Sequence, residues 1–180
     1  MKLEHAKAIA AELVKQLAPL CERIQIAGSI RREKPEVKDI EIVAIPKPYD
    51  VGLFESGIAT VVNRWIKVKG SLPCKYTQRE IAPLMHTPNA DVPREVLLDT
   101  IKLDLFFATP KNWGLILAIR TGSAEYSHQV LAMGWVRKGY ESIEGNLFHK
   151  ASRWERSIPE EKDLFDLIGI DWVEPKERNL

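Results

Sequence analysis

The chain has 180 residues, of which 45% are apolar and 28% charged, and its formal net charge is +1. These values are those of ordinary soluble globular proteins, and the length is sufficient for one or two compact units with a core. No apolar run approaches the roughly 20 residues that cross a bilayer, and Glu4 and Glu12 argue against a signal peptide. We therefore expect no membrane association and a location in the cytoplasm, or in a nucleoid within it.

The first predicted elements are a helix and two strands. Apolar residues at helical spacing predict an amphipathic helix over residues 2–18, which Pro19 closes. Alternating residues predict a strand over 23–27, and Gly28 then breaks the pattern. Residues 39–45 predict a second strand, which ends at the prolines that follow.

The middle of the chain is less regular. A set of apolar residues at helical spacing predicts a helix: Ile58, Val61, Val62, Trp65 and Ile66. Residues 70–100 are rich in proline and polar groups and favour no element. Residues 101–107 predict a third strand, closed by Pro110.

Beyond Pro110 the pattern changes. Helices are predicted over 111–119 and 123–137, short strands over 140–149, and a last helix over 159–168. The order of elements predicts an α+β fold, with a sheet domain over 1–110 and a smaller unit over 111–180.

Three carboxylates are the candidate catalytic residues. Alternate side chains of a strand share a face, so Asp39 and Glu41 project together, and Asp104 lies on the third strand. If these strands are neighbours, the three acids converge and repel one another unless cations lie between them. Two Mg²⁺ ions suit such a set, because Mg²⁺ takes hard oxygen ligands and shares them with substrate phosphates.

A turn ahead of the acids is a candidate phosphate site. Gly28 permits close approach of a phosphate to the backbone, Ser29 can donate a hydrogen bond, and Arg32 offers a fork of donors. Taken alone, each feature also fits an ordinary surface.

Four segments then occur in a recognisable order. They are AGSIRREKPEVKDIEIVAI (27–45), IKLDLFF (101–107), Thr-Gly-Ser (121–123) and EEKDLFDLIGIDWVEPKER (160–178). Together they resemble the motifs of the family X (DNA polymerase beta-like) DNA polymerases, in a minimal palm-plus-thumb form. The resemblance implies a nucleotidyltransferase palm over 1–110, a mixed β-sheet with helices, and a small α/β thumb over 111–180.

The resemblance also implies roles for particular residues. Asp39 and Glu41 would bind two Mg²⁺ ions, and Asp104 would bind the catalytic one and help to activate the primer 3′-hydroxyl. Nucleotide contacts would come from the side chains of Ser29 and Arg32, from the turns at Gly28 and Gly122, and from the backbone amide of Lys38. Primer or DNA contacts would come from Lys102, Arg120 and Ser127.

The chain also departs from the family pattern. Glu41 replaces the usual second aspartate, so Mn²⁺ activation is a further expectation. Ile119 and Arg120 stand where aromatic residues are common, and Ser127 and Leu131 stand where relatives check the base pair. We therefore expect low fidelity and weak rejection of ribonucleotides.

The predicted function is addition of nucleoside monophosphates from dNTPs to a primer 3′-hydroxyl on gapped or primer-template DNA. Because the net charge is small, we expect weak, salt-sensitive DNA binding and a protein partner that supplies additional grip. Two alternatives stay open: a template-independent nucleotidyltransferase acting on DNA, RNA, a protein or a small molecule, and a non-catalytic nucleic-acid-binding module.

The tryptophans are predicted to be mostly core or half-buried residues. Trp154 lies between Arg153 and Arg156, so stacking on a base or contact with a phosphate is an alternative for it, although packing is favoured.

Overall fold

The computed structural model describes residues 1–48, 57–58, 61, 67–69, 76–81 and 101–180. The helices and strands of the first part are α1 (Leu3–Leu17), η1 (Ala18–Leu20), β1 (Cys21–Ile26), α2 (Gly28–Arg31), β2 (Asp39–Pro46), β3 (Lys67–Lys69), β4 (Tyr76–Ile81) and β5 (Ile101–Phe107). Those of the second part are α4 (Trp113–Thr121), α5 (Ala124–Tyr126), η3 (Ser127–Ala132), α6 (Met133–Arg137), β6 (Tyr140–Ile143), β7 (Asn146–His149), β8 (Glu155–Arg156), α7 (Glu161–Ile168) and η4 (Pro175–Glu177).

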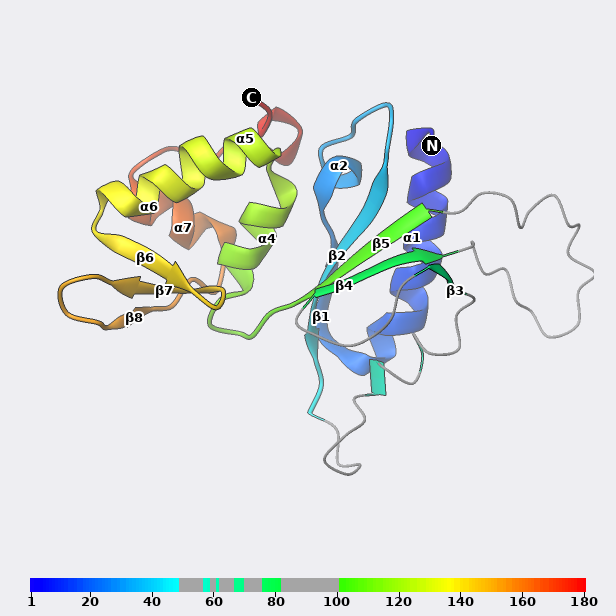
Figure 1. Ribbon diagram of the computed structural model, residues 1–180, viewed down its shortest axis with the longest axis horizontal. Helices are drawn as coiled ribbons and strands as arrows, with labels where there is room; N and C mark the ends of the chain where they lie inside the picture. Colours follow the sequence, from blue (N-terminus) through cyan, green and yellow to red (C-terminus); the bar gives the residue numbers. More distant parts are fainter. Residues whose placement is uncertain (49–56, 59–60, 62–66, 70–75, 82–100) are drawn as a thin grey trace, which may run out of the picture.

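The first part is built on a five-stranded mixed sheet in the order β1-β2-β5-β4-β3. Only β2 and β5 run parallel; the other neighbours are antiparallel. Helix α1 lies along one face of this sheet (Figure 1). That face is apolar because alternate residues of β2 and β5, including Ile40, Ile42, Leu103 and Leu105, pack against α1.

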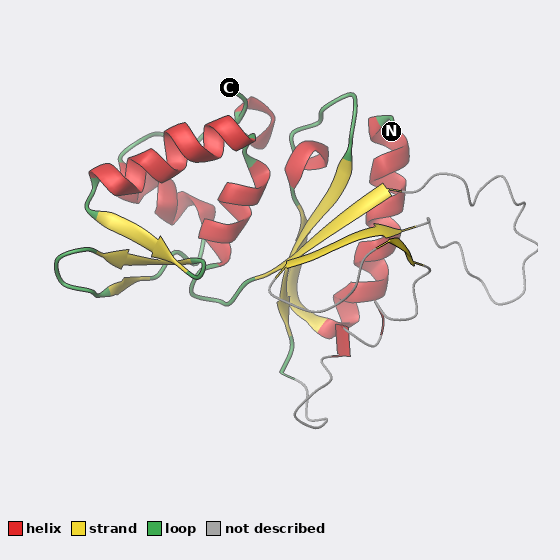
Figure 2. Cartoon of the chain, viewed as in Figure 1, coloured by secondary structure: helices red, strands yellow, loops and turns green. Residues whose placement is uncertain are grey.

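The second part places α4 to α7 over a three-stranded sheet in the order β6-β7-β8 (Figure 2). Its core contains Leu115, Tyr126, Leu131, Leu147 and Phe165, which come from the helices and from β7. Within α5 to α6 the chain is continuously helical, with a π-helical stretch at η3. The structure is therefore mixed α and β, as expected for the α+β class.

Helix α4 links the two parts because it packs on both. Leu115 and Ala118 belong to the core of the second part. Trp113 and Leu117 instead pack with Val43 and Phe106 on the face of the large sheet that α1 does not cover. The two parts thus share a helix, and the first residues after Pro110 contribute to the packing of the first part.

Most predicted elements are confirmed in the described residues. The strands expected over 39–45 and 101–107 correspond to β2 and β5, and the expected helix over 2–18 to α1. Of the helix expected around Ile58, Gly57, Ile58 and Val61 are described and helical; its other residues lie outside the described residues.

Three strands were not predicted. β3 has three residues, β4 lies in the segment that favoured no element, and β8 has two residues. Short strands carry too few residues for an alternating pattern to stand out. No described helix combines the length and the apolar composition that crossing a membrane requires.

Candidate active site

The three candidate carboxylates lie on one face of the large sheet. Parallel pairing of β2 with β5 puts Glu41 directly beside Asp104 and Asp39 beside Lys102. Because Asp39 and Glu41 are two residues apart on β2, all four side chains leave the sheet on the same side, opposite α1. The parallel register therefore brings together the acids of two segments that are more than sixty residues apart in sequence.

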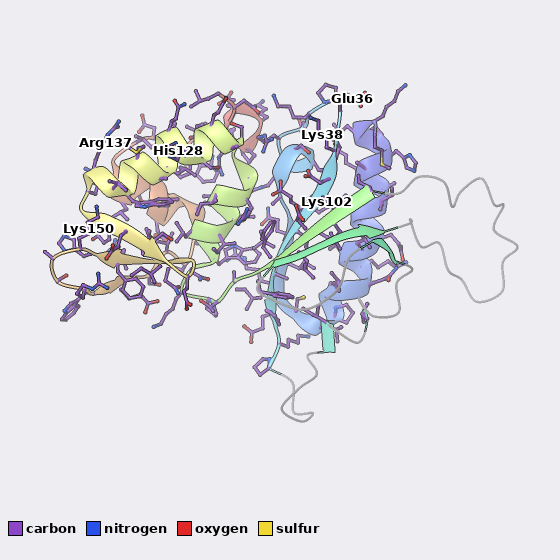
Figure 3. All side chains as sticks on the ribbon, in the orientation of Figure 1. Glu36, Lys38, Lys102, His128, Arg137 and Lys150 are labelled. Carbon is purple, nitrogen blue, oxygen red and sulfur yellow. The ribbon has the colours of Figure 1, made fainter. Side chains whose placement is uncertain are left out.

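Lys102 places a positive charge among these acids. Its Nζ donates a hydrogen bond to Asp104 Oδ2 at 2.8 Å and lies 3.8 Å from Asp39 Oδ2. The hydrogen bond to Asp104 raises the pKa of Lys102. Figure 3 shows Lys102 and Lys38 in the region where β2 and β5 begin. The ammonium group thus partly neutralises the cluster in the free protein.

Asp104 is only 7% exposed, and its second oxygen, Oδ1, is buried with no hydrogen-bond partner. Burying a charged oxygen without a partner is costly unless a cation or another donor meets it. This oxygen is the first indication that the cluster receives a further ligand.

Glu41 is the most strongly perturbed acid. Burial and the neighbouring carboxylate of Asp39 raise its pKa to about 7, and Asp104 acts in the same direction. The positive charges of Arg120 and Arg32 oppose this rise. Repulsion by Asp39 and Asp104 thus adds to burial in raising the pKa of Glu41.

The turn before α2 packs against Glu41. Gly28 has a φ of +61°, and a Cβ added there would lie 2.0 Å from Glu41 Oε2. The backbone N–H of Ala27 donates to the carbonyl of Glu41 at 2.8 Å, which fixes the turn to β2. Glycine is therefore needed for the backbone conformation and for the close approach of the carboxylate.

Ser29 follows in this turn, and its Oγ is buried with no hydrogen-bond partner. A buried hydroxyl without a partner is uncommon and indicates a group that is satisfied only by a ligand or by solvent. Ser29 and Asp104 Oδ1 are thus two polar atoms without partners on the elements that carry the candidate site.

Arg32 has other partners than the predicted phosphates. Its Nη1 donates to the carbonyl of Thr121 at 2.6 Å, and its Nε donates to Asn179 Oδ1 at 3.1 Å. Burial lowers the pKa of Arg32, while the acids at 39 and 41 oppose this. In this structure Arg32 joins the turn to the second part of the chain.

Sequence reasoning assigned no role to Arg31, which forms an ionic contact between the two parts. Its guanidinium donates to both oxygens of Glu161 at 2.9 and 2.7 Å and to Thr121 Oγ1 at 2.6 Å. Glu161 also accepts from Arg178, which is fully buried, at 2.5 Å. Arg178 ends the C-terminal motif, and nothing in the sequence pattern indicated its contact with Glu161.

The remaining predicted contacts lie around this region. Lys38 is exposed immediately before β2. The guanidinium of Arg120 lies over the ring of Phe106, 3.9 Å from its centroid. Gly122 ends α4, and Ser127 Oγ donates to the carbonyl of Ile119 at 2.7 Å. The hydroxyl of Ser127 thus satisfies a carbonyl in the last turn of α4 in this structure.

The carboxylate oxygens of this cluster are suitable ligands for a divalent cation. Carboxylate oxygens are the ligands that Mg²⁺ prefers, and the cluster has the unpartnered Asp104 Oδ1 and an ammonium group between two acids. Among the described residues, no group of three or more Asp, Glu, His or Cys side chains is arranged so that it could hold a metal ion. Metal binding would require Lys102 and the acids to rearrange.

Comparison with known proteins identifies the architecture. No family model matches the sequence, and no curated protein matches it. Among solved structures, Leishmania infantum polymerase beta, determined as a ternary primer/template complex, aligns over 100% of this chain and 77% of its own, with a TM-score of 0.74 and 14% identity. The chain has a polymerase beta-like fold.

At 14% identity this likeness concerns the fold. The polymerase beta-like fold accommodates both parts of the chain, because the alignment covers all of it. A fold of this kind does not determine function, which depends on the residues at the carboxylate face.

Proposed function

We propose that the chain is a metal-dependent nucleotidyltransferase that adds nucleoside monophosphates from dNTPs to the 3′-hydroxyl of a DNA primer. The observation that carries this proposal is the pairing of Glu41 with Asp104 on adjacent parallel strands, with Asp39 on the same face. The polymerase beta-like fold supports it, as does the primer/template complex in which the Leishmania protein was solved.

The acids would hold the metal. Asp39, Glu41 and Asp104 would bind Mg²⁺, which lowers the pKa of an attacking hydroxyl and neutralises the charge that develops on departing pyrophosphate. The protein's own contribution is to bring these side chains together on one face of the sheet. Asp104 Oδ1 has no partner within the described residues and is available to the incoming ligand.

The phosphates would lie at the turn. Gly28 leaves room beside Glu41, and the Ser29 hydroxyl has no partner to release before it donates to a phosphate oxygen. Arg32 would have to exchange its bond to Thr121 or Asn179 for one to phosphate. Nucleotide binding would thereby be coupled to the contact between the two parts of the chain.

The use of Glu41 in place of an aspartate bears on the choice of metal. Its longer side chain is held against Gly28, so its position is restricted by packing. Mg²⁺ demands near-ideal octahedral geometry, and Mn²⁺ is bound by similar ligands. We expect Mn²⁺ to support higher activity than Mg²⁺, and Glu41→Asp to reduce that difference.

The decisive experiment is extension of gapped, recessed and single-stranded primers, with each dNTP supplied separately and with either metal. Asp104→Asn and Asp39→Asn should abolish extension while DNA binding, measured by fluorescence anisotropy, is retained. Asp166→Asn is the matched control, because Asp166 is an exposed acid on α7.

Four outcomes separate the possible functions. Addition of only the nucleotide that pairs with the template supports the polymerase. Addition that ignores the template would instead indicate a template-independent nucleotidyltransferase. Full extension by the Asp104→Asn variant would refute the assignment of the carboxylate face, and DNA binding without extension by the parent would indicate a binding module.

A further inference from the structure

The small sheet carries a strongly exposed aromatic side chain. Trp154 is 79% exposed, whereas Trp113 is fully buried and Trp135 is 6% exposed. The prediction that Trp154 packs in the core or is half-buried is therefore wrong, and Trp172, at 42%, is also more exposed than expected. Because tryptophan is enriched at binding surfaces, a ring exposed to this degree is a candidate contact residue.

The turn between β7 and β8 holds Trp154 in place. The N–H of His149 donates to the carbonyl of Trp154 at 2.9 Å, and the N–H of Arg153 donates to the carbonyl of His149 at 2.8 Å. Ser152 donates its backbone N–H to His149 Nδ1 at 3.3 Å. Because backbone bonds close this turn, the backbone of Trp154 is held in place, which reduces the backbone entropy lost on binding.

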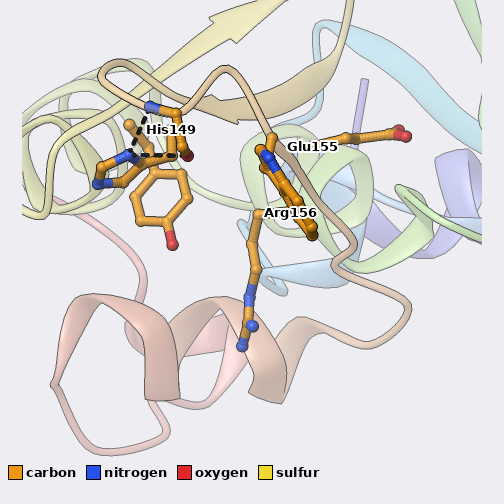
Figure 4. A pocket seen from close by; sticks show the side chains of 6 residues that line it. His149, Glu155 and Arg156 are labelled. Atoms are coloured by element: carbon orange, nitrogen blue, oxygen red, sulfur yellow. Dashed lines mark hydrogen bonds between the residues drawn. The ribbon is translucent and has the colours of Figure 1, made fainter.

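Trp154 borders a pocket of about 370 Å³, a volume at the lower end of those that hold small ligands (Figure 4). The pocket is lined by Tyr140, His149, Ser152, Trp154, Glu155 and Arg156. Tyr140 and His149 meet edge to face, with ring centroids 5.2 Å apart. Aromatic rings thus make up much of the lining, as a flat aromatic ligand would require.

The charges beside the pocket favour an anionic ligand. Arg153 pairs with Glu141, and Glu155 pairs with Lys111, so these charges are largely balanced. Arg156 has no ion-pair partner within the described part of the chain, and Figure 4 shows it pointing away from Glu155. Lys150, exposed on the same turn, has none there either, so two cations near the pocket are not balanced by an ion pair within the described residues.

We propose that this pocket binds single-stranded DNA, with an unpaired base stacked on Trp154 and the adjoining phosphates held by Arg156 and Lys150. An exposed indole beside unpaired cations is the arrangement that single-strand binding uses, since stacking is tolerant of sequence and the cations follow the backbone. Duplex DNA offers no free base faces away from its ends. The surface therefore distinguishes single strands from duplexes.

This pocket is separate from the carboxylate face. Figure 1 places β7 and β8 at the end of the molecule opposite α1, and Figure 3 places Lys150 far from Lys102. The inference goes beyond the proposed reaction and does not rest on it. If both hold, the pocket would retain an unpaired strand that extends beyond the site of synthesis.

The test is a binding measurement on the full chain, without metal or dNTP, so that no catalytic step enters. A fluorescein-labelled oligo(dT) would be titrated with the parent, Trp154→Ala, Trp154→Phe and Arg156→Ala, and followed by anisotropy. The controls are Ile143→Ala, which removes an exposed apolar group from the same sheet, and Lys162→Ala, which removes an exposed charge from α7. Circular dichroism would check that each variant is folded.

Trp154→Ala should weaken oligo(dT) binding about tenfold or more, and Trp154→Phe should weaken it much less because a phenyl ring still stacks. Arg156→Ala should weaken binding and lower the slope of log K against log salt by about 0.7. Quenching of intrinsic fluorescence by unlabelled oligo(dT) should be reduced in Trp154→Phe. Both controls should bind as the parent does.

Four results would overturn the proposal. The parent could fail to bind oligo(dT), which would leave a protein partner as the reason for the exposed ring. Trp154→Ala and Trp154→Phe could both behave as the parent. Blunt duplex of the same sequence could compete as well as the single strand. Lastly, dTMP could compete as well as the oligonucleotide, which would indicate a site for free nucleotides.

Discussion

The buried ionic contact between the two parts of the chain gives a sharp test of the structure. We consider Glu161→Ala, which removes the carboxylate shared by Arg31 and Arg178. The side chain of Glu161 is 6% exposed, that of Arg178 is 0% and that of Arg31 is 16%. The substitution therefore leaves two guanidinium groups with little access to water and without their counter-ion.

The expected loss is large because it arises from the groups left behind. Removing one partner of a buried ion pair typically costs about 3–5 kcal/mol, whereas exposed pairs contribute about 1 kcal/mol or less. Arg31 keeps its bond to Thr121 Oγ1 and Arg178 keeps its bond to the carbonyl of Val173, so we expect the lower end of the buried range, about 3 kcal/mol.

Urea unfolding, followed by circular dichroism and by tryptophan fluorescence, measures this loss. Glu4→Ala is the matched control, because Glu4 pairs with Lys7 at 3.2 Å while its side chain is 84% exposed. That variant should lose less than about 1 kcal/mol. If Glu161→Ala is destabilised no more than Glu4→Ala, the buried network does not hold the two parts together.

Three further predictions concern the carboxylate face. In EDTA, Glu41→Gln should be more stable than the parent at pH 8, by at most about 3 kcal/mol, and equal to it near pH 4. The pKa of Glu41 is raised from 4.5 to about 7, so the folded parent binds more protons than the unfolded chain and its stability falls as the pH rises between those values. Parallel pH profiles of the urea midpoints of the two proteins would contradict this. Gly28→Ala should lower the free energy of unfolding by at least about 1 kcal/mol, because φ is +61° and the new Cβ would meet Glu41 Oε2; an unchanged urea midpoint would show that the turn adapts. Lys102→Met should tighten Mn²⁺ binding measured by calorimetry without DNA, because the ammonium no longer competes for Asp104 Oδ2; weaker binding would mean that Lys102 instead helps to orient the acid.

The sequence predicted the acid-bearing strands well for a physical reason. β2 and β5 each have one face buried under α1, so apolar and polar residues alternate over 39–42 and 101–105, where the acids lie. Ile40, Ile42, Leu103 and Leu105 face the helix, and the acids necessarily face the other way. The pattern fixes the face of each side chain, but the parallel register that sets Glu41 beside Asp104 requires the structure.

The contacts of the two neighbouring arginines were beyond sequence reasoning. Arg31 and Arg32 are the same residue type and are neighbours in the sequence, so composition does not distinguish them. Their side chains nevertheless point in different directions, because they are consecutive residues at the end of a single helical turn. In the structure Arg31 pairs with Glu161, 130 residues away in sequence, while Arg32 bonds to a backbone carbonyl. Polar contacts over such separations leave no periodic signal, whereas apolar faces do.

The way in which the two parts are joined follows from these contacts. α4 supplies apolar packing to both cores, and its last residue, Thr121, accepts hydrogen bonds from Arg31 and Arg32. The turn that carries Ser29 is thus tied to the end of the shared helix by guanidinium bonds, which are directional and can be exchanged for bonds to another anion. An apolar contact at the same place would offer no such exchange. A phosphate that recruits Arg32 would therefore weaken one link between the parts, while Arg31, held by Glu161, preserves another.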